Sequence, residues 1–140
     1  MLPLRLVIDT NVVVSAALKP DGLQRTIFLL ALTKPARLYV SEPILVEYRD
    51  VLSRPELQIR KGLQRQFLDL IRNRAYTVSL VRPLSVTTDP DDNIFVECAD
   101  AARADYLVTG NPRHFPKFWK RTKVITSRDF IDIVAPHMIP

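Results

Sequence analysis

Four polar residues in separate segments of this 140-residue chain could together bind a divalent cation. Asp9 and Asn111 each follow a short apolar run that is typical of a buried β-strand. Glu47 and one of the two acids Asp91 and Asp92 lie in segments with the apolar spacing of helices. Such oxygen ligands suit Mg²⁺ or Mn²⁺, and the ion can orient a water and neutralise charge on a phosphodiester oxygen. The pattern therefore indicates metal-assisted phosphodiester hydrolysis.

Each of these residues also has an ordinary structural interpretation. Asp9 could cap the helix that follows it. Glu47 falls just outside an apolar helix stripe, where a surface glutamate can cover apolar area with its stem. Asn111 follows Gly110, and both residue types are common in turns. His114 belongs to the same loop, and a lone loop histidine is usually solvated.

A cluster of three acids at the start of a predicted helix has only a partial structural explanation. Asp89 can be the N-cap, and acids in a first turn interact favourably with the helix dipole. Three acids within four residues repel one another, and a cation would relieve that cost. Asp91 projects from the end of the apolar stripe and Asp92 lies at its margin, so helix geometry leaves the choice of ligand open.

The elements that position these residues alternate between strand and helix. We expect strands at 4–8, 37–40, 76–81, 106–108 and 123–125. We expect helices at 11–18, 23–33, 41–54, 57–74 (in one piece or broken at Gly62), 89–104 and 128–134. This alternation predicts an α/β protein with a parallel sheet covered by helices on both faces. Ligands of such sheets gather at the carboxyl ends of the strands.

Composition is that of one soluble globular domain, residues 1–140. The only cysteine, Cys98, excludes an internal disulfide and favours a reducing compartment. With no apolar stretch long enough to span a bilayer and no signal pattern, we expect a cytoplasmic protein without membrane contact. The net charge of +5 is concentrated in 54–74 and 113–123. Together with a local acidic cluster, this charge fits a nucleic-acid partner. The simpler interpretation is that the charged residues form solvated helix faces.

Four segments make the chain resemble a known family: VIDTNVVVSA at 7–16, SEPILVEYRDVLSRP at 41–55, DPDDNIFVECADAARADYLVTGN at 89–111 and RHFPKF at 113–118. The chain resembles the PIN-domain nucleases, especially the VapC-like toxins of bacterial and archaeal toxin–antitoxin pairs. The segments span nearly the whole chain in the family's order. The resemblance implies a PIN-like fold, with a central parallel sheet of four or five strands and helices on both faces.

The resemblance also implies a Mg²⁺- or Mn²⁺-dependent endoribonuclease. The family's metal-binding acids fall on Asp9, Glu47 and Asp92, the last chosen because an apolar pair follows it at the family's spacing. The fourth catalytic position, an aspartate in many members, is Asn111 in this chain. It would support substrate or metal hydration together with Thr10 or Thr109. Homodimers and inhibition by a small antitoxin protein are further implications, with RNA as the substrate.

Two other functions remain possible on these residues. Asn111 brings no charge to the site, which fits a PIN-fold nucleic-acid-binding protein of weak or no catalytic activity. An aspartate-nucleophile phosphotransferase also places an Asp after its first strand, but it usually needs a second Asp where this chain has Asn11. Asp105 and Asp129 are further acids that nothing in the sequence moves into the site.

Overall fold

The computed structural model describes residues 4–138, and the side chains of residues 4–134. The ends of the expected domain, residues 1–3 and 139–140, lie outside the described residues. Within residues 4–138, one six-stranded sheet has the order β3-β2-β1-β4-β6-β5. The strands are β1 (Arg5–Ile8), β2 (Arg37–Val40), β3 (Tyr76–Thr77), β4 (Tyr106–Val108), β5 (Phe118–Trp119) and β6 (Thr122–Ile125).

The sheet is parallel except for one edge. β1 pairs in parallel with both β2 and β4, and β6 and β3 extend the parallel arrangement on either side. The expected α/β fold with a parallel central sheet is confirmed. β5 is antiparallel to β6. It was not predicted from the sequence, because a strand of two residues is too short to show an alternating apolar and polar pattern.

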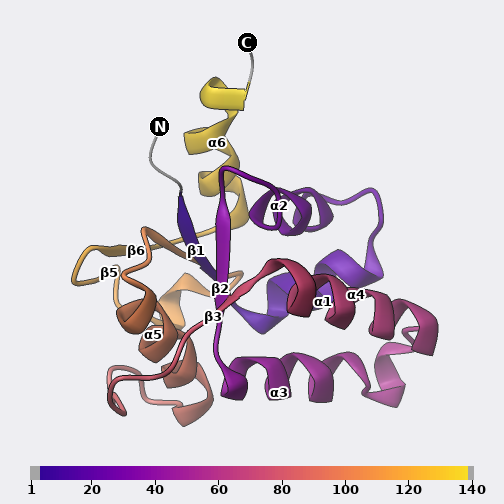
Figure 1. Ribbon diagram of the computed structural model, residues 1–140, viewed down its shortest axis with the longest axis horizontal. Coiled ribbons are helices and arrows are strands. Elements are labelled where there is room, and N and C mark those ends of the chain that lie inside the picture. The colour runs from indigo at the N-terminus through magenta and orange to yellow at the C-terminus, as the bar shows by residue number, and fades with distance from the viewer. Residues whose placement is uncertain (1–3, 139–140) are drawn as a thin grey trace.

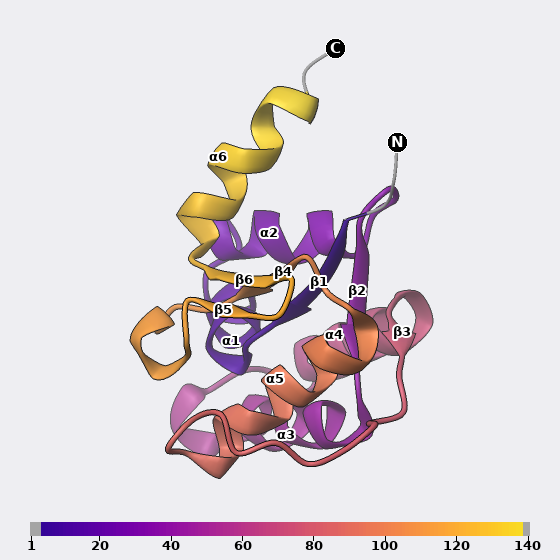
Figure 2. The ribbon, with the colours of Figure 1, turned by 90° about the vertical axis from the view of Figure 1, so that its left-hand side faces the viewer.

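Helices cover both faces of the sheet. They are α1 (Thr10–Leu18), α2 (Leu23–Ala31), α3 (Glu42–Leu52), α4 (Lys61–Arg74), α5 (Pro90–Ala102) and α6 (Ser127–Met138), with 3₁₀ turns η1 (Pro55–Leu57) and η2 (Pro112–His114). α5 packs against β1, β2 and β4 on one face, and α1 and α2 lie on the other (Figure 1). α6 packs against α2 and projects beyond the body of the molecule (Figure 2).

The central strand β1 shows why the sequence adopts this arrangement. Leu6, Val7 and Ile8 are all fully buried, as expected for a strand with helices on both faces, where an unbroken apolar run replaces alternation. Ser41 then ends β2 and caps α3, its hydroxyl oxygen accepting from the Ile44 N–H at 3.4 Å. β1 and β2 are thus each followed at once by a helix start on the same edge of the sheet.

Two expected elements differ from the structure. The strand expected at 76–81 is only two residues long, because β2 ends at Val40 and the chain turns into α3, which leaves the next residues without a pairing strand. The break before α4 does not fall at Gly62, which lies inside the helix. It falls near Gln58, whose φ of 53° is left-handed.

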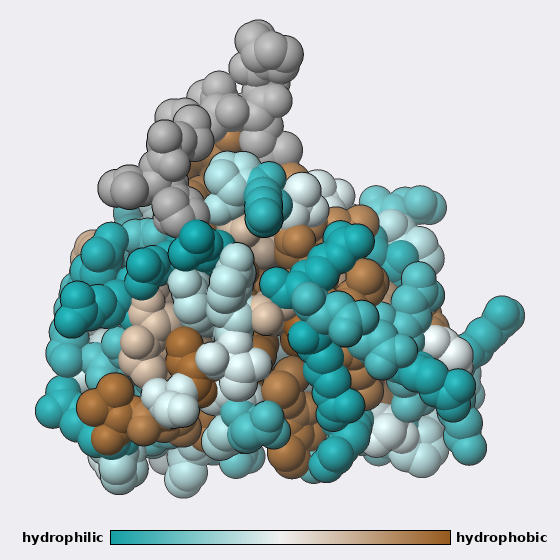
Figure 3. All heavy atoms as spheres, viewed as in Figure 1, coloured by the Kyte–Doolittle hydropathy of each residue, from teal (hydrophilic) through white to brown (hydrophobic). Residues whose placement is uncertain are grey.

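The basic cluster at 54–74 is solvated. All six of its cations are exposed, and hydrophilic residues cover the outer face of α4 (Figure 3). None of the described helices is long and apolar enough to cross a membrane.

Candidate acidic site at the carboxyl edge of the sheet

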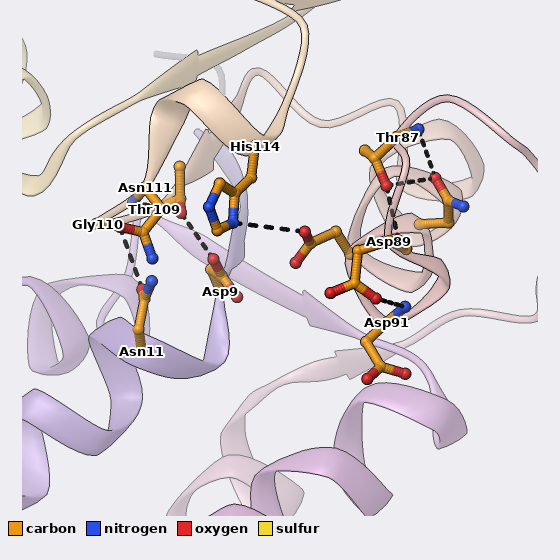
Figure 4. A network of polar contacts seen from close by, with 11 residues as sticks. Asp9, Asn11, Thr87, Asp89, Asp91, Thr109, Gly110, Asn111 and His114 are labelled. Carbon is orange, nitrogen blue, oxygen red and sulfur yellow. Dashed lines mark hydrogen bonds and ion pairs between the residues drawn. The ribbon is translucent and has the colours of Figure 1, made fainter.

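The structure places Asp9 and Asn111 after neighbouring strands, on the same edge of the sheet. β1 and β4 are in register at Ile8 and Val108, so the residues that follow them are adjacent. The Asp9 side chain is only 7% exposed and makes no capping hydrogen bond to α1. Its Oδ2 instead accepts from the Thr109 hydroxyl at 2.7 Å (Figure 4). Asp9 is therefore held by β4, which argues against the interpretation as a simple helix cap.

A second set of contacts fastens the loop after β4 to the start of α1. The Gly110 N–H donates to Asn11 Oδ1 at 3.1 Å, and the Asn111 N–H donates to Thr109 Oγ1 at 3.0 Å. A Cβ on Gly110 would lie 3.4 Å from the Asn11 side-chain amide, at the short end of ordinary van der Waals contact. The exposed Asn111 side chain stands at the mouth of this loop.

Glu47 reaches the same edge from α3. The Thr10 hydroxyl donates to Glu47 Oε2, and Glu47 is half-buried. The neighbouring Tyr48 is fully buried, and its hydroxyl donates to the Ile8 carbonyl at the end of β1. Thus adjacent residues of α3 contact the last residue of β1 and the first residue of α1. The sequence analysis did not anticipate that Tyr48 connects α3 to β1.

We expect Tyr48→Phe to lower the free energy of unfolding by about 1–3 kcal/mol, because it removes a hydrogen bond from a buried carbonyl. Chemical denaturation measures the change. Tyr39→Phe is the matched control: Tyr39 is also buried, and within the described residues its hydroxyl has no hydrogen-bond partner. Equal effects of the two substitutions would contradict the importance of this hydrogen bond.

Asp92 faces the site from the first turn of α5. Its side chain is 16% exposed, and its Oδ2 lies 3.6 Å from His114 Nδ1. Asp91 is exposed, and Asp89 caps the helix by accepting from the Asp91 N–H at 2.9 Å (Figure 4). The sequence left Asp91 and Asp92 as alternatives. Asp92 is the less exposed of the two and is repelled by Asp9, while both acids repel the charge of Glu47. The contact with Asp92 also brings in His114, which was interpreted from the sequence as a solvated loop residue.

The electrostatics of the site are those of crowded carboxylates. Burial, above all, raises the pKa of Asp9, and hydrogen bonds from Thr109 and the Thr10 backbone only partly offset it. Burial likewise raises the pKa of Glu47, with repulsion from Asp9 and the α5 acids added. The pKa of Asp92 is raised by burial and by repulsion from Asp9 and Asp89, against a lowering by His114. The charge of Asp9 thus adds to the cost of ionising both Glu47 and Asp92.

This acidic site does not hold a closed cage of ligands. Among the described residues, no three His, Cys, Asp or Glu side chains stand close enough together to surround an ion as they are. Mg²⁺ is commonly bound through one or two carboxylates and keeps several waters. The hard oxygen donors and uncompensated negative charge of Asp9, Glu47 and Asp92 fit such a partly hydrated cation.

A groove of about 540 Å³ opens beside Asp92. Arg113 and His114 of η2 line it on one side, and the segment 86–89 lines it on the other. Asn93, only 8% exposed, fixes that segment, since its Oδ1 accepts from the N–H groups of residues 86 and 87 at 3.1 and 2.8 Å. This anchoring role of Asn93 was not visible in the sequence.

The two remaining acids considered in the sequence lie elsewhere. Asp105 accepts from the Arg5 N–H at 2.8 Å, at the opposite edge of the sheet where β1 begins. Asp129 lies at the start of α6 and accepts from the Thr126 N–H at 3.4 Å.

A mostly parallel α/β sheet with acids gathered at its carboxyl edge defines the class of this protein, and sequence comparison gives the family. A model of the PIN domain matches residues 5–113, so the chain belongs to the PIN domain family, a family of nucleases.

The chain is also similar to individual proteins, in sequence or in fold. An uncharacterized protein of Methanocaldococcus jannaschii is 28% identical over 94% of this chain and 92% of its own length. A chain in the crystal structure of VapBC2 from Rickettsia felis, bound to a DNA fragment from their promoter, superposes with a TM-score of 0.58. That match covers 88% of this chain and 98% of the other at 16% identity, and so shows a shared fold.

Proposed function

We propose that this protein is a metal-dependent endoribonuclease that hydrolyses phosphodiester bonds in RNA. The observation that carries the proposal is the crowding of Asp9, Glu47 and Asp92 at one edge of the sheet, with the pKa of each raised. Raised pKa values in a cluster are common at functional sites. Keeping three acids in mutual repulsion has a stability cost that a bound cation would remove.

In this proposal the three acids hold Mg²⁺ or Mn²⁺. The bound ion would activate a water and neutralise charge on the phosphate. Thr109 and Thr10 position Asp9 and Glu47 through the hydroxyl hydrogen bonds described above. Asn111, exposed at the mouth of the loop, supplies an uncharged amide to substrate or to water around the ion. His114 moderates the charge of Asp92.

The biological setting is a further part of the proposal. The likeness in fold to a chain of VapBC2 supports a toxin of a toxin–antitoxin pair, whose activity a small antitoxin protein restrains. The proposal further includes a cytoplasmic location and a homodimer, as the family resemblance implies. RNA as the substrate is supported by the net charge of +5 and by the exposed cations near the acidic site.

Asn111 favours a second candidate function. Since an amide replaces a charge at the end of β4, the chain could bind nucleic acid through the same fold with little or no cleavage. The two functions differ in one measurement. Purified protein should cut single-stranded RNA with Mn²⁺ or Mg²⁺ present and should stop when EDTA is added. RNA binding without any metal-dependent cut would support the binding protein instead.

Asp92→Asn and Asp91→Asn form a matched pair, because they make the same change at neighbouring positions of α5. We expect Asp92→Asn to reduce cleavage by about a hundredfold or more, since the half-buried Asp92 faces the other acids. Asp91→Asn should retain activity within about threefold, because its side chain is exposed and surface charges are screened. Initial rates of cleavage measure both. A larger loss from Asp91→Asn would move the ligand to Asp91.

A further inference from the structure

The segment 113–123 connects the acidic site to the far edge of the sheet and carries cations and aromatics without a single acid. It contains five cations and three aromatic residues: Arg113, Lys117, Lys120, Arg121, Lys123, Phe115, Phe118 and Trp119. It lines more than one groove. Its start lines the groove beside Asp92, and its end lines a second groove of about 400 Å³ at β5 and β6. The hairpin that holds the second groove lies in the foreground of Figure 2.

An aromatic ring and a cation lie side by side in the second groove. Phe118 is the register partner of Lys123, and Lys123 is also the partner of Tyr106, so the three side chains form a row on one face of the sheet. α6 covers the Tyr106 end of that row through Phe130, with ring centroids 6.2 Å apart. Phe118 lies beyond this cover and is 60% exposed. Its ring is therefore open to a flat ligand.

The opposite face of the hairpin is fastened to α5. Asp100 accepts from Trp119 Nε1 at 3.2 Å and pairs with Lys120 Nζ at 2.7 Å. On the side of the second groove, Arg121 pairs with Asp105 at 2.7 Å, and both side chains line that groove. Lys117 and Lys123 have no acidic partner among the side chains of residues 4–134. The hairpin thus presents the exposed Phe118 ring and two uncompensated cations.

We infer that the segment 113–123 binds single-stranded RNA, with Phe118 stacking on an unpaired base and with Lys117 and Lys123 contacting neighbouring phosphates. The inference rests on the proposed function, because it takes RNA as the substrate, and it adds that the RNA must be unpaired some distance from the cut. A base inside a duplex cannot offer its face to a side chain, whereas an unpaired base can. The excess of positive charge favours this polyanion over an apolar protein segment as the occupant.

Binding in EDTA tests the inference without requiring cleavage. The probe is a short fluorescent single-stranded RNA, measured by anisotropy against the same sequence as a duplex. We expect Phe118→Ala to weaken single-strand binding about tenfold and Phe118→Trp to restore it, since every base offers a face to an aromatic ring. Leu29→Ala is the matched control, because Leu29 is 45% exposed on α2, away from the segment, and it should bind like the unaltered protein.

The charge contribution has its own measurement. Lys123→Gln should reduce the slope of log affinity against log salt concentration by about 0.7, the value for one phosphate contact on a single strand. Lys19→Gln, an exposed lysine before α2, should leave the slope unchanged. Equal binding by Phe118→Ala and Leu29→Ala would overturn the inference, and so would a duplex bound as tightly as the single strand.

These outcomes are distinct from those of the proposed function. If the unaltered protein cuts RNA while Phe118→Ala binds and cuts equally well, the inference fails and the nuclease proposal stands. If Phe118→Ala loses binding while the unaltered protein cuts nothing in Mn²⁺, the nuclease proposal fails and the single-strand site stands.

Discussion

Asp9→Asn is expected to reduce Mn²⁺-dependent RNA cleavage by about a thousandfold while the protein stays folded. Asp9 is the most buried of the three acids and is held in place by Thr109. Replacing its carboxylate by an amide removes charge at the point where the proposed ion binds, and several kcal/mol of charge stabilisation correspond to about this change in rate. The Thr109 hydroxyl can still donate to the amide oxygen, so the local geometry is retained.

The same substitution should leave the metal-free melting temperature unchanged or raise it. Burial disfavours the charge on Asp9 and raises its pKa, and asparagine carries no charge. Cleavage kinetics and thermal melting in EDTA on one preparation measure both effects. Asp50→Asn is the control, since its side chain on α3 is 65% exposed. Undiminished cleavage by Asp9→Asn would remove Asp9 from the catalytic site, and a large fall in melting temperature would show a structural role instead.

Mn²⁺ is expected to stabilise the fold, and the gain should depend on pH. At a free concentration about 100 times its dissociation constant, an ion that binds only the folded protein adds about 2.7 kcal/mol. For a chain of this size that is a rise of roughly 8 °C in melting temperature. Asp9→Asn should lose most of this gain, because one of the three acidic ligands is gone.

The direction of the pH effect follows from the raised pKa values. The ordinary values are 3.8 for Asp9 and Asp92 and 4.5 for Glu47. Between those values and the raised ones, the folded protein holds more protons than the unfolded chain. The stability contributed by these acids therefore falls as pH rises through that window and grows as pH falls.

Metal binding has the opposite dependence, because the ion must displace those protons. The Mn²⁺-induced rise should be largest near neutral pH and should shrink toward about pH 5. Melting curves with Mn²⁺ and with EDTA across this range measure the difference for the unaltered protein and for Asp9→Asn. A rise that does not change with pH, or one that is equal in both proteins, would contradict binding at these acids.

Asp100 provides an internal contrast. The hydrogen bond from Lys120 lowers its pKa, so its stabilising contribution is complete above the ordinary value of 3.8 and is lost as pH falls below it. Its acid dependence is therefore opposite in sign to that of the acidic site. The contact between Lys120 and Asp100 is the same in the unaltered protein and in Asp9→Asn. A difference between the pH dependences of these two proteins therefore comes from the acidic site and not from Asp100.

The sequence by itself determined the main strands and the segments that carry the acids. The apolar run before Asp9 and the one before Asn111 are unbroken because both faces of those strands are covered. Ser41 is a local capping signal that the structure retains. Since such signals depend on neighbouring residues, the parallel α/β fold and its acidic edge were predictable from local pattern.

Tertiary structure decided how the side chains of that edge meet. The Thr109 hydroxyl reaches Asp9 across 100 positions of sequence, and Tyr48 reaches Ile8 across 40. Helical periodicity could not choose between Asp91 and Asp92, because the rotation of a helix about its axis is set by what it packs against. The strand β5 was hidden for the same reason: two residues form a strand only when β6 is beside them to accept and donate their hydrogen bonds.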